Sequence, residues 1–147
     1  MFYLGLLLIL TLLVAALFIA PLRSKIWVAF TTVIIAVAAL SYPAITALMT
    51  THPIVLMQAQ GPIFGAENLS IDSLSALFLI IIGIAGIATI IYSRGYLAQY
   101  IDKKSSAHIS LHYAALVIMI LSMMLVVMSS GGFSFLFSWE LMTIASF

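Results

Sequence analysis

One carboxylate, Glu140, lies in an otherwise almost wholly apolar segment, FSFLFSWELMTIASF (133–147). If a helix enters the membrane near Ser130, a rise of about 1.5 Å per residue places Glu140 about 15 Å deep, near the middle of a hydrocarbon core about 30 Å thick. An acidic side chain at that depth costs about 3 kcal/mol, so it needs a cationic partner, a water-filled path or protonation. We predict a proton-relay or cation site; the alternative is a neutral acid that hydrogen-bonds a neighbouring helix.

Three further side chains are secondary candidates. Asp72 stands before an apolar run with Ser75 three residues later, a pattern that predicts a helix N-cap in preference to an ion site. His108 and His112 are four residues apart and share a helix face. They are interpreted as polar residues at the start of a helix, and proton transfer is the alternative because histidine titrates near neutrality. No third metal ligand lies near them in sequence, so no metal site is predicted.

The composition requires a membrane. Hydrophobic residues make up 65% of the 147 residues and charged residues 6%, whereas a typical soluble domain has about 25% charged residues. The mean hydropathy is +1.33. We therefore predict an all-α, polytopic transmembrane helix bundle. A net charge of +1 indicates no nucleic-acid partner, the absence of cysteine excludes thiolate metal sites, and no cofactor or redox motif is present.

The apolar segments predict four full spans and an incomplete fifth within one domain, residues 1–147. Pro43 is expected to kink or end the second span. All basic residues fall in two of the four connecting loops, so the positive-inside rule places the N-terminus outside. The loop at about 50–70 is expected to fold against the outer helix ends. The predicted spans are about 2–22, 26–49, 73–100, 111–128 and 133–147.

Two segments resemble the antiporter-like membrane subunits of respiratory complex I. IDSLSALFLIIIGIAGIATIIYSRGYL (71–97) resembles the third helix of that family, and FSFLFSWELMTIASF resembles the fifth, with its Trp-Glu pair. The family includes large subunits of Mrp-type cation/proton antiporters and of energy-converting hydrogenases, and the fifth-helix segment resembles most the hydrogenase-4 and formate hydrogenlyase type. The resemblance implies that Glu140 pairs with a lysine on a later, broken helix and takes part in proton translocation. It assigns no catalytic role to Asp72.

The resemblance also implies that more of the subunit exists. Family members resemble antiporters of about fourteen helices built from two inverted repeats, and this sequence ends within the first repeat. We expect either a fragment, which the mid-helix ending favours, or a separately encoded N-terminal piece. The expected function is the N-terminal part of a proton- or sodium-translocating subunit in a prokaryotic inner membrane. Its partners would be the missing C-terminal part, other membrane subunits, lipid and the transported H⁺ or Na⁺. The alternative is a structural or assembly subunit in which Glu140 only ties helices together.

Overall fold

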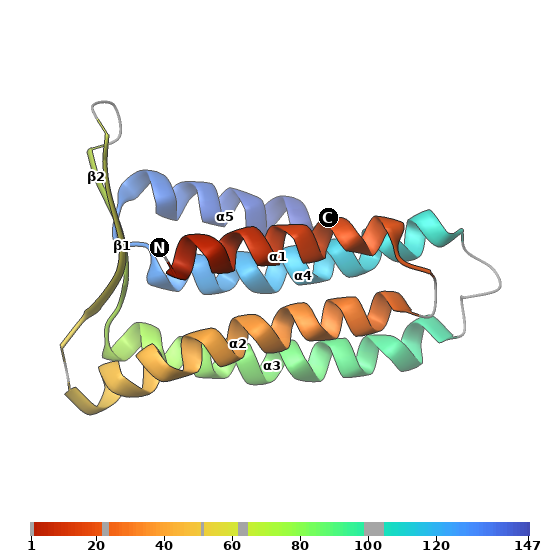
Figure 1. The fold of residues 1–147 in the computed structure, drawn as a ribbon, viewed down its shortest axis with the longest axis horizontal. Helices are drawn as coiled ribbons and strands as arrows, with labels where there is room; N and C mark the ends of the chain where they lie inside the picture. Colours follow the sequence, from red (N-terminus) through yellow and green to blue (C-terminus); the bar gives the residue numbers. More distant parts are fainter. Residues whose placement is uncertain (1, 22–23, 51, 62–64, 99–104) are drawn as a thin grey trace.

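The computed structural model describes residues 2–21, 24–50, 52–61, 65–98 and 105–147. These residues form a bundle of helices that lie side by side, with a β-hairpin across one end (Figure 1). We call this the hairpin end; the beginning of α2, the end of α3 and the beginning of α4 lie at the opposite end. The elements are α1 (Phe2–Ile19), α2 (Lys25–Thr50), β1 (Ile54–Gly61), β2 (Gly65–Ile71), α3 (Ser73–Ala98), α4 (Ser106–Met128) and α5 (Gly132–Ser146).

Three helices of the described chain, α2, α3 and α4, are long and apolar enough to cross a membrane. They contain 26, 26 and 23 residues, and a rise of about 1.5 Å per residue makes each longer than a hydrocarbon core about 30 Å thick. The helical transmembrane character predicted from composition is confirmed. The helices α1 and α5 contain 18 and 15 residues, so the count of four full spans stays a prediction.

Helix α1 ends at Ile19, three residues before the predicted end of its span, whereas α2 covers the whole of its predicted span of about 26–49. Pro43 does not end α2, which continues to Thr50. The helix α4 begins at Ser106, five residues before the predicted start of its span. Positions 99 and 100, the end of the predicted third span, lie outside the described residues.

The β-hairpin is a departure from the predicted all-α fold. Strands β1 and β2 pair antiparallel, from Ile54 opposite Ile71 to Gly61 opposite Gly65, with a bulge between Val55 and Met57. The expectation that this loop folds against the helix ends is confirmed. Ile71 is fully buried, Leu56 and Leu69 pack against the core, and Leu69 forms a β-bridge with Ser129.

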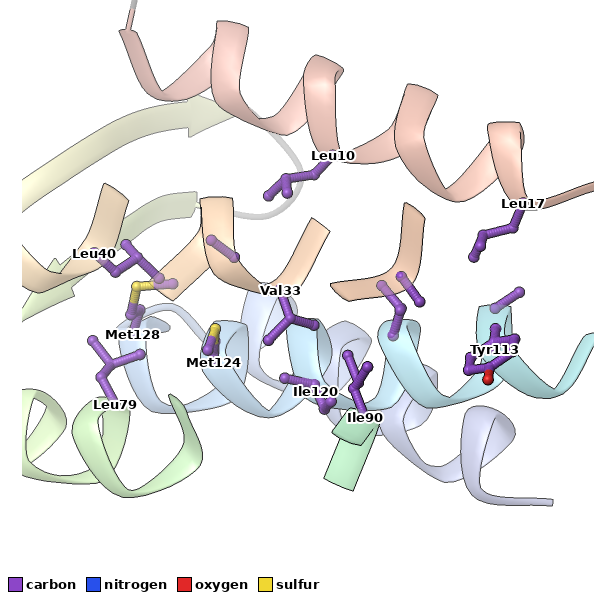
Figure 2. Packing of buried hydrophobic residues seen from close by; sticks show 14 of the residues in the cluster. Leu10, Leu17, Val33, Leu40, Leu79, Ile90, Tyr113, Ile120, Met124 and Met128 are labelled. Carbon is purple, nitrogen blue, oxygen red and sulfur yellow. The ribbon is translucent and has the colours of Figure 1, made fainter. Parts of the chain in front are cut away.

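The apolar core lies between the first four helices, where leucine, isoleucine, valine and methionine side chains meet (Figure 2). Close approach of α3 depends on small residues: a Cβ at Gly83 would lie 3.3 Å from Val37 of α2, and one at Gly86 would lie 3.0 Å from Ile120 of α4. Helix α5 packs on α4, but Ser138 is its one buried residue. Most of the surface of α5 is therefore left uncovered by the described chain.

Candidate functional site

Glu140 lies on the side of α5 that faces away from α4. Ser138 is buried and Ser134 and Leu141 are half-buried, so these residues mark the side of α5 that packs on the bundle. Glu140 is exposed and lies eight residues after Gly132, where α5 begins, which is about 12 Å along the helix axis. The depth of Glu140 in a membrane stays a prediction.

The surroundings of Glu140 on this helix are apolar. Helical spacing places Phe133, Phe137 and Ile144 on the same face, and all three are exposed. The rings of Phe133 and Phe137 stack with their centroids 6.1 Å apart. Within the part of the chain that the structure describes, no hydrogen bond or ion pair reaches the Glu140 carboxyl group. In the membrane position that the sequence predicts for α5, a carboxyl group on such a face requires protonation or a partner from outside the described residues.

Asp72 caps α3 at the hairpin end. Its Oδ1 accepts a hydrogen bond of 2.7 Å from the backbone N–H of Ser75, which confirms the capping interpretation. This N–H, followed by the Ser75 side chain, lowers the pKa of the Asp72 carboxyl group from its ordinary value. The hydroxyl of Ser75 also donates to the carbonyl of Val127, at 2.6 Å. The first turn of α3 is thereby fastened to the end of α4.

The two histidines lie near the start of α4, at the opposite end of the bundle from Asp72, and they interact with different partners. The exposed His108 has its Nδ1 2.7 Å from Ser105 Oγ. The Nε2 of the half-buried His112 lies 3.3 Å from Ser93 Oγ on α3. The rings of His112 and Tyr113 form a T-shaped pair with their centroids 5.8 Å apart. Among the described residues no three acidic, histidine or cysteine side chains are grouped closely enough to hold a metal ion. The structure brings the histidines together with neither Asp72 nor Glu140.

Lys25 has a role that the sequence analysis missed, because it was counted there only as a loop charge. Its side chain is 1% exposed. The ammonium group donates to the Ser106 carbonyl at 3.0 Å, to Ser106 Oγ at 2.9 Å and to Ser110 Oγ. Ser110 Oγ also bonds the carbonyl of Leu17, at 3.0 Å. One buried ammonium group and two serines therefore join α1, α2 and α4. A Ser-x-x-x-Ser pair on one helix face was the available signal, although it does not identify its partner.

Glu67 was also missed, and it acts at the helix that carries Glu140. Its Oε1 accepts the backbone N–H of Phe133 at 3.1 Å and its Oε2 that of Ser134 at 3.0 Å. Hydrogen bonding by Ser134, through its side chain and its backbone, lowers the pKa of the Glu67 carboxyl group from its ordinary value, and the Phe133 N–H adds to this effect. A side chain of β2 thus caps α5. No local sequence pattern indicates this contact, because the partners are 66 and 67 residues away.

An apolar cavity within the described residues does not include Glu140 in its lining. It has a volume of about 310 Å³ and lies between α1, α2, the hairpin, α4 and α5. Its lining is almost entirely apolar and contains no charged side chain. The hydroxyls of its two polar residues, Thr11 and Ser122, already donate to carbonyls of their own helices. The cavity therefore offers no polar binding group that would complete a site with Glu140.

A family comparison matches the central part of the chain. Residues 67–107 match the sequence model of a family described as NADH-ubiquinone oxidoreductase (complex I), chain 5 N-terminus. The matched range begins at Glu67 and includes Asp72 and all of α3. A comparison with curated protein sequences gave no match. The family match confirms the resemblance that the third-helix segment suggested.

Proposed function

We propose a function from the premise that this chain is the N-terminal portion of an antiporter-like membrane subunit of the complex I type, as the match over residues 67–107 supports. Such a subunit works within a multisubunit membrane complex. We infer that the chain contributes to cation translocation, of protons or sodium ions, and that Glu140 is the carboxylate that binds and releases the transported cation within the membrane.

The observation that carries this proposal is the position of Glu140. It stands about two turns inside α5, on an exposed face with phenylalanines, and no described residue neutralises it. A cation that approaches this face favours the ionised carboxylate, and withdrawal of the cation favours the protonated acid, because burial in an apolar medium disfavours the charge. Alternation between these two states moves one proton. The resemblance to the family supplies the cation as a lysine on a later helix.

The distribution of basic residues supports an orientation for this process. Lys25 begins α2 and Arg94 lies near the end of α3, so both belong to the end of the bundle opposite the hairpin (Figure 1). By the positive-inside rule we place that end at the inner surface, and the N-terminus and the hairpin outside. In this arrangement α1 forms a fourth full span and α5 enters from the outer surface. The prokaryotic inner membrane expected from the sequence remains part of the proposal.

The proposal is tested with Glu140→Gln in the complete subunit, assembled in its complex and reconstituted into vesicles. Glutamine keeps the size and polarity of glutamate but cannot ionise. We expect cation uptake to fall about a hundredfold, the scale seen when a positioned acid–base group is removed. Glu140→Asp is the matched control that retains an acid, and it should keep a measurable rate. Uptake measured with and without sodium separates the two ions.

The alternative role of Glu140, tying helices together, is separated in the same samples. A purely structural Glu140 predicts that Glu140→Gln translocates at a near-normal rate per assembled complex while the complex melts at a lower temperature. That combination would overturn the translocation proposal. A loss of translocation at an unchanged melting temperature supports it.

A further inference from the structure

We propose that Glu67 is a positioning residue for Glu140: the hairpin carboxylate sets the depth and rotation of α5, and thereby the place at which Glu140 meets its cation. This inference rests on the proposed function of Glu140. It assigns to Glu67 no contact with the transported ion. Glu67 acts through the backbone of α5, at a distance of about two helical turns from Glu140.

The first step of the argument is the satisfaction of backbone donors. The first N–H groups of a helix have no partner within the helix. In α5 two of them, at Phe133 and Ser134, donate to the two oxygens of one carboxylate. The negative charge also lies at the positive end of the helix dipole. The residue before α5, Gly131, has no side chain that could cap the helix. Glu67 therefore supplies the cap from another element, β2.

The second step is that β2 also binds the residues just before α5, through hydrogen bonds and a β-bridge. The carbonyl of Asn68 accepts bonds from both the backbone N–H and the hydroxyl of Ser130, at 3.0 and 2.9 Å. Leu69 bridges to Ser129. Gly131 gives the carboxylate room, because a Cβ at that position would lie 1.9 Å from Glu67 Oε2. Three consecutive residues of β2 thus hold the chain from Ser129 to Ser134.

The third step is that α5 buries little of its surface against the described chain, although it packs along α4. Ser138 is the one buried residue of this helix, and its aromatic residues are mostly exposed. A slip of one residue would move Glu140 by about 1.5 Å along the axis and about 100° around it. Such a rotation would carry the carboxyl group off its face. The Glu67 cap opposes this slip because the slip would leave the two N–H groups without acceptors.

The experiment compares Glu67→Ala and Glu67→Gln in the complete complex with the wild type. Two readouts are taken: hydrogen exchange of the peptide that covers residues 131–140, and the pH profile of translocation per assembled complex. In Glu67→Ala we expect faster hydrogen exchange and a translocation rate reduced about tenfold. The apparent pKa of the translocation profile should shift by about one unit. Glu67→Gln retains one acceptor oxygen and should lie between Glu67→Ala and the wild type.

The outcomes separate this inference from the proposed function. If Glu140→Gln stops translocation while Glu67→Ala leaves both the exchange and the pH profile unchanged, the positioning role is wrong and the function of Glu140 stands. If Glu67→Ala only lowers the amount of complex and leaves the pH profile unchanged, Glu67 is merely structural and the inference is also wrong. If Glu140→Gln translocates normally, the proposed function fails, and the positioning inference that rests on it fails with it.

Discussion

The two ends of the bundle are held by charged side chains of opposite sign and different surroundings. At the hairpin end the partly exposed carboxylate of Glu67 accepts two backbone N–H groups of α5. At the opposite end the buried ammonium of Lys25 donates to oxygens of Ser106 and Ser110 on α4. In both cases the partner is uncharged and lies more than 60 residues away in the chain.

The difference in burial between Lys25 and Glu67 indicates what each charged side chain contributes to the bundle. Inside lipid, apolar helices gain little by leaving hydrocarbon for one another, so polar contacts and close packing determine which helices associate. A buried ammonium group that loses its acceptors is costly, whereas an accessible carboxylate can return to water. We therefore expect the Lys25 contacts to matter mainly for stability and the Glu67 contacts mainly for the geometry of α5.

The largest effect is expected from removing the acceptors of Lys25. The double variant Ser106→Ala, Ser110→Ala leaves a buried ammonium group with one backbone acceptor, and we expect the free energy of unfolding to fall by about 3 kcal/mol. Lys25→Met removes the charge itself, while Ser110 keeps its bond to the Leu17 carbonyl. It should therefore cost less. Unfolding in a detergent titration measures both, and a larger loss in Lys25→Met than in the double variant would contradict this account of the opposite end.

The second prediction concerns Gly131 and tests whether its lack of a side chain is needed for the Glu67 cap at the hairpin end. Gly131→Ala places a Cβ where the Glu67 carboxylate lies, so it should displace the cap and reproduce the faster hydrogen exchange of Glu67→Ala. Gly132→Ala is the matched control, because a Cβ there meets no atom within 4 Å. In a Glu67→Ala background the Gly131 substitution should add little, since the group that it displaces is already gone. Equal exchange in Gly131→Ala and Gly132→Ala would show that the close approach is unimportant.

The third effect is smaller and tests a cap that acts within one element. Asp72→Ala removes the acceptor of the Ser75 N–H and should reduce the free energy of unfolding by about 1 kcal/mol. Asp72→Asn keeps an acceptor oxygen and should cost only a few tenths of that amount. Translocation per assembled complex should stay normal in both variants. A translocation defect in Asp72→Asn without a loss of stability would assign Asp72 an ionic role.

The smallest effect is expected from pH. Hydrogen bonding lowers the pKa of the Glu67 carboxyl group from its ordinary value of 4.5. The stabilisation of the start of α5 by the ionised carboxylate is therefore present above that value and is lost as pH falls through the lowered pKa. Exchange protection of the Phe133 and Ser134 amides should therefore decline in acid below about pH 4.5, after correction for the intrinsic exchange rate. Glu67→Gln should remove this decline. A decline that persists in Glu67→Gln would assign it to another group.

The predictable parts of the molecule depend on neighbours in sequence. Long apolar runs predicted the membrane helices, because length and hydropathy suffice for that inference. Asp72 was predicted as a cap because its partner is three residues away. The hairpin was not predicted. Its strands, IVLMQAQG and GAENLSI, do not alternate regularly between apolar and polar residues, and their separation of three residues in sequence is not the two-residue spacing that signals a hairpin most strongly.

The sequence by itself determined that this is a helical membrane protein and which segments form its long helices, and it predicted that Glu140 is the charge most in need of a partner. These conclusions follow from hydropathy and helical rise, which are local properties. The tertiary structure alone decided what Lys25 and Glu67 do. It set Lys25 among the serines of α4 and Glu67 at the start of α5, because those contacts arise only when segments 66 to 85 residues apart fold together.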